Sequence, residues 1–357
     1  MTKPSLLIVG YYHLEDGFLA CSNYLKNDYD IYFFPLSHYH DSKYDIRSEL
    51  VQYINGDQCE HYECGLKPHN NPINVVLIWH FKYFIENHAR LNIFVNIKNE
   101  VKHDVLYLGY NWDPQPPEKG LELMKILFIR LLDYYLTCDG REISILKDMG
   151  EYNYVYCPSG YDPTITHYIE DNSYECDISI VCTNLYYDYD LFPLECVRVH
   201  RGSLVDLVYA HRSEFKFHIY GPSELGEKYP ECYRGYIKYN ECPRVFSNSK
   251  INLCIHATSH NNYGTYSYFS ERLPQILGSR GLLYCDTVYE YLLKPDLNYI
   301  LADDIDPLGQ IRNIINNYHH LKYCQIKDNG YELATKHLTW NNMRQKISLI
   351  NERKYIN

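Results

Sequence analysis

The sequence predicts an α/β protein with two doubly wound parallel sheets, one in each half of the chain. Residues 244–286 read as strand, polar loop, helix and strand, which is the βαβ order of a parallel sheet. Short apolar runs alternate with helical patterns on both sides of a breaker-rich stretch near residue 160. The length of 357 residues also suits two α/β domains better than one.

In the first half, the apolar run Ser5 to Gly10 predicts a strand that leads into a first βα turn. Further strands are predicted at Asp30–Phe34, Ile73–Trp79, Leu91–Val95, Val105–Leu108, Tyr134–Thr137 and Tyr152–Tyr156. Helical periodicity covers 121–132 and 143–149. The polar stretch His38–Lys67 is weakly periodic and predicts helix with irregular insertion.

Pro158, Gly160 and Pro163 break the pattern and are followed by an acidic run, which predicts a linker at 160–176. The second half restarts with a strand at Asp177. Its other strands are predicted at 215–221, 251–255, 282–285 and 299–301, and its helices at 197–210, after residue 270, at 308–318 and at 331–353. We therefore expect domains at 1–165 and 166–335, and a terminal helix at 336–357.

The amino-acid composition predicts the cellular compartment of the protein and the kinds of partner that it binds. The net charge of -11 and the absence of a basic stripe predict no nucleic-acid partner. The 13 scattered cysteines are an odd number, and no charged-then-apolar leader opens the sequence, so reduced thiols and a cytoplasmic location are expected. No apolar run is long enough to span a bilayer, which predicts a soluble protein with no transmembrane segment.

A series of short motifs occurs in a fixed order along most of the chain from about residue 105. Ser270-Glu271-Arg272 opens a helix, and Gln275, Gly281, an apolar strand and Asp286 follow. Other pieces in the same order are Tyr110-Asn-Trp-Asp-Pro114, Pro158-Ser-Gly-Tyr-Asp-Pro163, Asp177-Ile-Ser-Ile-Val-Cys-Thr183, His218-Ile-Tyr-Gly221, Gly235-Tyr-Ile237 and His337-Leu-Thr-Trp340. This order resembles GT-B glycosyltransferases, in particular the spore-maturation-type glycosyltransferase-like family.

The resemblance implies two Rossmann-like domains facing across a crevice, with the last helix crossing back to the first domain. It implies transfer of a sugar from a nucleotide-sugar donor (UDP-, GDP- or dTDP-sugar) to an acceptor hydroxyl, with no required metal or other cofactor. The second domain would bind the donor, and the first would bind a glycan or protein acceptor.

The resemblance also assigns donor-binding roles. Arg272 matches the family's arginine and would grip the diphosphate, where an exposed helix N-terminus and a cation both favour an anion. Gln275 stands where the family carries a glutamate for donor hydroxyls, so it keeps an acceptor oxygen and loses the charge; Glu271 is the nearest substitute. Further candidates at the donor loop and pocket are Tyr220, Gly221, His256, Tyr263 and Ser270. Ordinary loop polarity explains His256 and Tyr263 equally well.

An inverting transferase needs a general base from the crevice. The first βα turn supplies His13 and Asp16, and the turn after Trp112 supplies Asp113. A histidine titrates near neutrality, which favours His13. Each also has a structural reading: a solvated loop histidine, a helix cap at Asp16 and a turn at Asp113.

Two patterns suggest a metal, and neither is interpreted as a site. Asp-x-Asp spacings occur at 28/30, 188/190 and 304/306, but none is placed where a metal-dependent transferase would hold its ion. Cys59 and Cys64 flank His61, and no second ligand pair follows at a suitable spacing.

Three other functions stay open. A metal-dependent GT-A transferase would lose activity when an Asp-x-Asp pair is replaced. A relative without catalysis would bind a nucleotide sugar and not turn it over, and Gln275 in place of glutamate supports this alternative. An epimerase of the same architecture would alter the sugar with no added acceptor. The sequence leaves the oligomeric state undetermined.

Overall fold

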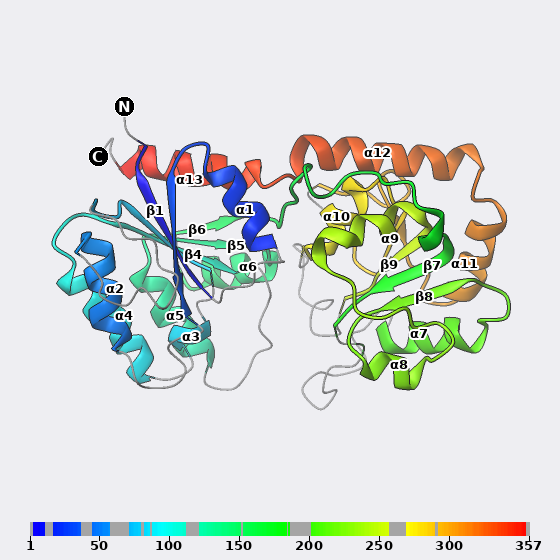
Figure 1. Ribbon diagram of the computed structural model, residues 1–357, viewed down its shortest axis with the longest axis horizontal. Coiled ribbons are helices and arrows are strands. Elements are labelled where there is room, and N and C mark those ends of the chain that lie inside the picture. The colour runs from blue at the N-terminus through cyan, green and yellow to red at the C-terminus, as the bar shows by residue number, and fades with distance from the viewer. Residues whose placement is uncertain are drawn as a thin grey trace. The chain divides into compact units, whose positions relative to one another are not determined.

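The computed structural model describes residues 3–10, 17–36, 45–57, 71–79, 82–85, 88–111, 121–150, 153–183, 185, 201–256, 269–289 and 292–354. The chain divides into two compact units. Unit 1 comprises Met1–Leu14, Cys21–Pro158 and Met343–Asn357, and unit 2 comprises Glu15–Ala20 and Ser159–Asn342. Each unit holds one parallel sheet with helices on both faces, so the predicted α/β class with two doubly wound units is confirmed (Figure 1).

The sheet of unit 1 has six parallel strands in the order β2-β1-β3-β4-β5-β6. Their bounds are Ser5–Gly10 (β1), Asp30–Pro35 (β2), Val75–Ile78 (β3), Leu106–Asn111 (β4), Tyr134–Thr137 (β5) and Tyr154–Tyr156 (β6). Every residue of β1, β3 and β4 is buried. A central strand covered on both faces reads as a continuous apolar run, which is why the sequence located these three.

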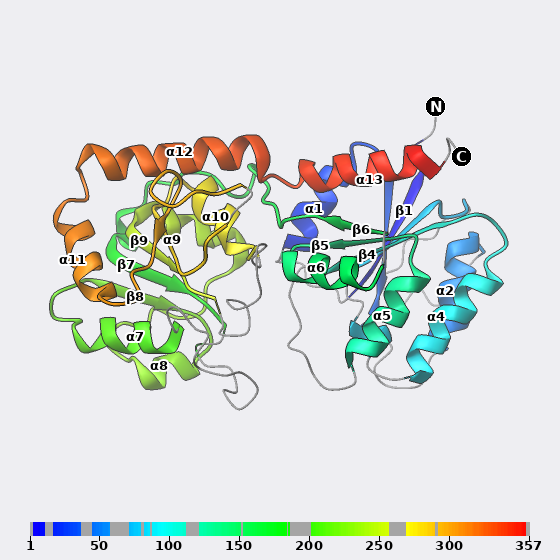
Figure 2. The same ribbon diagram turned by 180° about the vertical axis from the view of Figure 1, so that it is seen from behind.

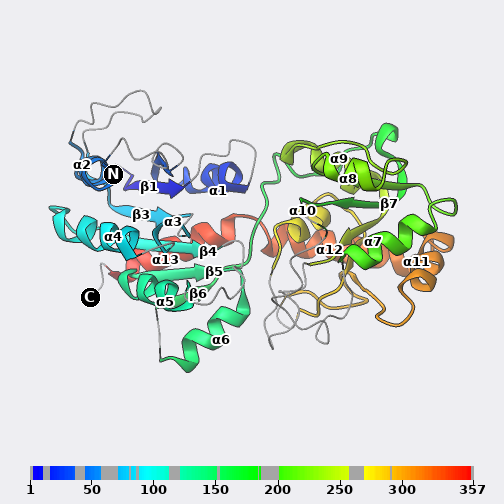
Figure 3. The same cartoon turned by 90° about the horizontal axis from the view of Figure 1, so that it is seen from below.

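The helices of the first half are α1 (Gly17–Leu25), α2 (Ile46–Asn55), α3 (Lys82–Ile85), α4 (His88–Glu100), α5 (Leu121–Leu131) and α6 (Gly140–Asp148). Helices α2, α4 and α5 lie on one side of the sheet of unit 1 and the terminal helix α13 (Asn341–Lys354) on the other (Figures 1 and 3). Lys346 Nζ of α13 donates to the Tyr156 carbonyl at 2.9 Å, and Ser348 Oγ donates to Asp28 Oδ2 at 3.1 Å.

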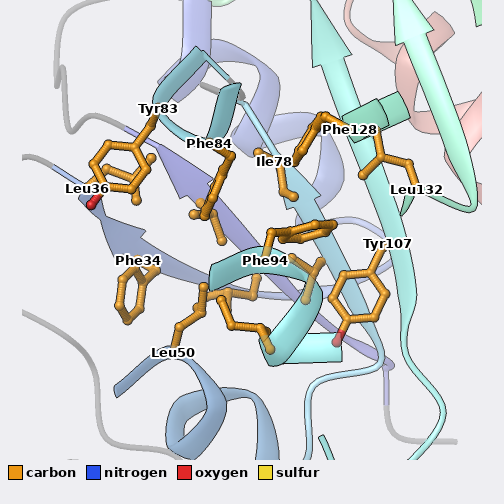
Figure 4. Close-up of a cluster of buried hydrophobic side chains, with 14 of the residues drawn as sticks. Phe34, Leu36, Leu50, Ile78, Tyr83, Phe84, Phe94, Tyr107, Phe128 and Leu132 are labelled. Carbon is orange, nitrogen blue, oxygen red and sulfur yellow. The ribbon is translucent and has the colours of Figure 1, made fainter. Parts of the chain in front are cut away.

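The predicted strand Leu91–Val95 is wrong, because these residues lie inside α4. Leu91, Phe94 and Ile97 are the buried residues of α4, and their spacing of three places them on one helical face. Phe94 packs against Phe128 of α5 with ring centroids 5.0 Å apart (Figure 4). A five-residue window contained too little of this period to distinguish helix from strand.

The sheet of unit 2 has five parallel strands in the order β11-β10-β9-β7-β8. Their bounds are Cys176–Val181 (β7), Phe217–Tyr220 (β8), Ser249–Cys254 (β9), Leu283–Cys285 (β10) and Ile300–Leu301 (β11). The helices are α7 (Arg201–Ala210), α8 (Glu224–Lys228), α9 (Cys242–Asn248), α10 (Arg272–Gly278), α11 (Pro307–Asn316) and α12 (Leu321–His337). Helices α9, α10 and α12 cover one face of this sheet, and α7 and α8 cover the other (Figure 2).

The predicted continuous helix at 331–353 is interrupted at 338–340, which separates α12 from α13. There the Tyr161 N–H donates to the Leu338 carbonyl at 3.0 Å, and the Trp340 N–H donates to the Tyr161 carbonyl at 3.1 Å. A Cβ on Gly160 would lie 2.6 Å from the Trp340 nitrogen, so glycine is required for this close approach of two backbones.

Among the described residues, no helix has both the length and the apolar character needed to cross a membrane.

Candidate active site

Polar and charged side chains gather where four parallel strands of unit 2 end. Strand β7 ends at Val181, β8 at Tyr220, β9 at Cys254 and β10 at Cys285. Val181 is the register partner of Tyr220, and Cys254 is the partner of Cys285, so these ends lie at one edge of the sheet. In open α/β sheets, ligands bind beyond this carboxyl edge.

Arg272, the predicted diphosphate ligand, is the first residue of α10 and is half-buried at this edge. Its Nη1 donates to the Val181 carbonyl at 3.0 Å, and its backbone N–H donates to Ser270 Oγ at 3.4 Å. The guanidinium is therefore held at the end of β7 by the fold itself.

Arg201, a residue that sequence reasoning missed, brings a second guanidinium to the same edge. It belongs to α7, is 7% exposed, and donates from Nε to the Ile255 carbonyl at 2.5 Å, directly after β9. Burial and, as the second cause, the positive charge of Arg272 lower the pKa of Arg201 to about 10. The sequence carried no signal for Arg201, because the predicted helix 197–210 placed it inside a helix like any solvated arginine.

The interaction between these two arginines defines what the edge can bind. Like charges in a buried setting raise each other's free energy, and the charge of Arg272 is the second cause, after burial, of the lowered pKa of Arg201. An anion placed beside both guanidiniums would reverse this effect, and planar guanidiniums can each contact two phosphate oxygens. Two guanidiniums at one edge of the sheet therefore favour an anionic ligand.

Gly221 follows β8, where the backbone must come close to its neighbours. A Cβ at this position would lie 2.2 Å from the Cys182 carbonyl oxygen and 2.7 Å from Leu225 Cδ1. The Tyr220 side chain is buried, and its hydroxyl lies 3.5 Å from His218 Nδ1; burial raises the pKa of Tyr220. At this strand end the Tyr220 ring belongs to the core, and the backbone of Gly221 forms the edge.

His256 lies one residue past Ile255, and its side chain is fully buried. The donor-binding role expected of it stays a prediction. Its Nδ1 is 2.8 Å from Asp286 Oδ1, and its backbone N–H donates to both Asp286 oxygens at 3.1 and 3.2 Å. Thr287 Oγ1 lies 3.1 Å from the same Nδ1, and the Tyr289 hydroxyl lies 3.3 Å from Nε2. This network joins the ends of β9 and β10.

The remaining predicted donor residues on α10 and before it are mostly covered. Ser270 and Gln275 are each 4% exposed, while Glu271 is half-buried. Ser270 contributes by accepting the Arg272 N–H. A bond from Gln275 or Glu271 to donor hydroxyls stays a prediction.

The predicted base candidates and one donor residue lie outside the described residues: His13, Asp16, Asp113 and Tyr263. The same holds for the Cys59, His61 and Cys64 cluster and for Asp188 and Asp190. Of the other Asp-x-Asp pairs, Asp306 Oδ1 accepts the Gly309 N–H at 2.9 Å and caps α11. Asp28 pairs with Arg344 of α13 at 3.4 Å.

Unit 1 carries a buried charged cluster at the carboxyl edge of its own sheet, which sequence reasoning also missed. Glu142 of α6 forms an ion pair with Lys125 of α5. Asn111 Nδ2, at the end of β4, donates to Glu142 at 2.8 Å. The Tyr135 and Thr137 hydroxyls of β5 donate to it at 2.8 and 2.6 Å. Four donors satisfy this carboxylate, so it is suited to holding the strand ends together.

Comparison with known proteins adds chemistry to this geometry. Residues 201–348 match the model of a family described as glycosyl transferase-like. That segment contains both arginines and the His256 network. A search of curated proteins gave no significant match.

Solved structures of glycosyltransferases share the fold over nearly the whole chain. An α-glucosyltransferase in complex with UDP and a 13-mer DNA containing an HMU base has a TM-score of 0.61 at 11% identity, covering 98% of this chain and 100% of its own. A glycosyltransferase from Rickettsia africae ESF-5 scores 0.62 at 10% identity, covering 99% of each chain. A UDP-forming α,α-trehalose-phosphate synthase from Burkholderia xenovorans scores 0.55 at 10% identity, covering 98% and 99%. At identities this low, the likeness shows the fold alone.

The expected partners, a glycan or protein acceptor and no nucleic acid, are wrong as stated. Structures that share this fold over 98% of the chain hold DNA together with UDP or UDP-glucose. The inference from net charge failed for a physical reason: net charge describes the whole surface, whereas nucleic-acid binding depends on a local patch. A charge of -11 is compatible with such a patch.

Proposed function

We infer that this GT-B glycosyltransferase, an enzyme of the group 1-related kind, transfers a sugar from a UDP-sugar to an acceptor hydroxyl. One observation carries the proposal: Arg201 and Arg272 come from different helices to one edge of the sheet in unit 2. UDP is favoured over other nucleotides because similar structures are described with UDP, with UDP-glucose or as UDP-forming.

The arginines would act on the leaving group. When the bond between the sugar and the diphosphate breaks, negative charge grows on the departing phosphate oxygens. Two cations already fixed by backbone carbonyls would stabilise that charge with little reorganisation. We propose on this ground that donor cleavage needs no divalent ion, since the guanidiniums supply the positive charge that a metal would otherwise bring.

We propose a hydroxyl on DNA as the acceptor to test first. Support comes from the several structures of the same fold that hold DNA, among them DNA with an HMU base and DNA with an abasic site. The base that takes the acceptor proton stays assigned to His13, Asp16 or Asp113. Single replacements of these three residues would separate them by their pH-rate profiles.

The test begins with binding of UDP and UDP-sugars, measured as thermal stabilisation with EDTA present. A ligand at about one hundred times its dissociation constant should add about 2.7 kcal/mol of stability. Arg272→Ala and Arg201→Ala should lose this stabilisation. Arg212→Ala is the matched control, because Arg212 is an exposed arginine of the same unit that pairs with Glu231.

Transfer is then followed as UDP release and as labelled sugar on a DNA oligonucleotide carrying hydroxymethyl bases. Transfer in EDTA that is lost in both arginine variants supports the proposal. Activity only with a divalent ion contradicts metal independence. Binding without turnover indicates a protein that has lost catalysis, and an altered sugar without acceptor indicates an epimerase. No stabilisation by any nucleotide overturns the donor site.

A further inference from the structure

Three metal-ligating side chains converge between the ends of β9 and β10. The donor atoms His256 Nδ1, Cys285 Sγ and Asp286 Oδ1 all lie within 4.8 Å of one another. The separations are 2.8 Å between nitrogen and oxygen, 3.7 Å between sulfur and oxygen, and 4.0 Å between sulfur and nitrogen. Among the described residues, this is the one such group of three.

These separations are close to those of a tetrahedral zinc site. Zinc lies about 2.0–2.1 Å from nitrogen, about 2.0–2.2 Å from carboxylate oxygen and about 2.3 Å from sulfur, so tetrahedral ligands are roughly 3.3–3.6 Å apart. The observed separations bracket that range. Shifts of about half an ångström would bring the three atoms onto one ion.

Cys254 supplies a fourth ligand of the right kind; its sulfur is not among the atoms that all lie within 4.8 Å of one another, so its side chain must turn toward the ion. Cys254 is the last residue of β9 and the register partner of Cys285 on β10, and His256 lies two residues beyond the end of β9. Register partners share one face of a sheet, so the Cys254 and Cys285 side chains lie on the same face, and the His256 ring reaches Cys285 Sγ at 4.0 Å. Two short segments thus meet at the ends of neighbouring strands. One is Cys254-x-His256, and the other is Cys285-Asp286.

The surroundings are those of a closed structural site. The His256 and Asp286 side chains are 0% exposed, and Cys254 and Cys285 are equally buried. Structural zinc sites have four protein ligands and no open position. Tyr289, 3.3 Å from His256 Nε2, is placed to accept the proton of that nitrogen and leave Nδ1 as a ligand.

We propose that Cys254, His256, Cys285 and Asp286 form a structural zinc site that joins β9 to β10 beside the two arginines. Zn²⁺ enters as the hydrated ion and binds the two cysteines as thiolates. Their two protons and the water molecules of the ion go to solvent. The histidine stays neutral with its proton on Nε2. No electron is transferred. This ion is distinct from a metal on the donor diphosphate, and the proposal is independent of the transferase reaction.

The test uses the full chain purified without a metal-affinity step. Elemental analysis should find about one zinc per chain. After chelation and dialysis, Co²⁺ should bind one per chain and produce the absorption band that marks a thiolate-cobalt bond. Cys285→Ser should lose about half of this band, because Cys254 remains as a thiolate ligand, and the double variant Cys254→Ser/Cys285→Ser should lose all of it. Cys176→Ser should keep it, because Cys176 is a buried cysteine of β7 that contacts Ser249 outside the cluster.

Tyr289→Phe should weaken cobalt binding by about 10- to 100-fold, the usual effect of removing a group that orients a metal-bound histidine. If Cys285→Ser fails to fold, the wild-type titration decides. Absence of a thiolate band at stoichiometric Co²⁺ overturns the proposal and leaves a hydrogen-bonded His256–Asp286 pair. A band of unchanged intensity in folded Cys285→Ser, or any band in the folded double variant, overturns it as well.

Discussion

Arg201 donates its Nε proton to the Ile255 carbonyl at 2.5 Å, one residue before His256. This bond connects α7 to the backbone leaving β9, so the guanidinium is oriented before any ligand arrives. Arg272 is oriented in the same manner by the Val181 carbonyl. Groups fixed in advance stabilise a developing charge better than groups that must reorganise.

Arg201→Lys tests this orientation separately from charge. Lysine keeps the positive charge but lacks the Nε donor and the planar fork, so UDP binding should weaken by about 10- to 100-fold, the worth of a hydrogen bond to a charged group. Calorimetric titration with UDP measures the change. Arg212→Lys should bind UDP as wild type does, and unchanged binding in Arg201→Lys would show that charge alone suffices.

Gly221→Ala should destabilise unit 2 by about 1–3 kcal/mol, because the new methyl group would meet the Cys182 carbonyl at 2.2 Å and backbone cannot move aside cheaply. Urea unfolding measures the loss. Gly235→Ala is the control: its φ of +97° is unfavourable for alanine, but nothing lies within 4 Å of the added carbon. Nucleotide binding should fall in the first variant and persist in the second.

His218 predicts a pH dependence of stability. Burial and, to a smaller extent, the charges of Arg234 and Lys216 lower the pKa of His218 to about 4. The unfolded chain takes up this proton below about pH 6.5 and the folded protein only near pH 4, so folding stability from this group falls as pH drops between those values. His218→Gln should lose that part of the slope in urea unfolding at pH 7 and pH 4.5. An identical slope in variant and wild type would contradict the assignment.

Glu142→Gln should destabilise unit 1 by about 3–5 kcal/mol, because it leaves the ammonium of Lys125 half-buried without its carboxylate. The control is Glu100→Gln, which removes one partner of the exposed pair with Arg47 and should cost at most about 1 kcal/mol. Urea unfolding compares the two. Equal losses would mean that the donors from β4 and β5 add nothing to the pair.

The sequence located the strands that are buried on both faces and the order of elements in unit 2, because such strands have a local apolar signature. It failed at Leu91–Val95, where a window of five residues did not show the helical period of α4. The candidate site was only partly predictable. Arg272 was identified through a motif, whereas Arg201 is recognisable only from its bond to Ile255, 54 residues away.

His256 and Asp286 illustrate the same limit. Both residues were noted as parts of motifs, but their separation of 30 residues gives no sign that they touch. That contact depends on the register of β9 and β10, which places Cys254 beside Cys285. Register is a property of the assembled sheet. Side-chain contacts between neighbouring strands therefore cannot be predicted from the sequence of either strand alone.

The assignment of residues from Met343 onward to unit 1 has a consequence for biosynthesis. Domains generally fold as units while the chain is being made, the amino-terminal one first. Here the residues of α13 that contact Tyr156 and Asp28 are synthesised after all of unit 2. While unit 2 is being synthesised, the earlier part of unit 1 therefore lacks the α13 helix that packs on its sheet. Unit 2 can complete its fold before unit 1 does.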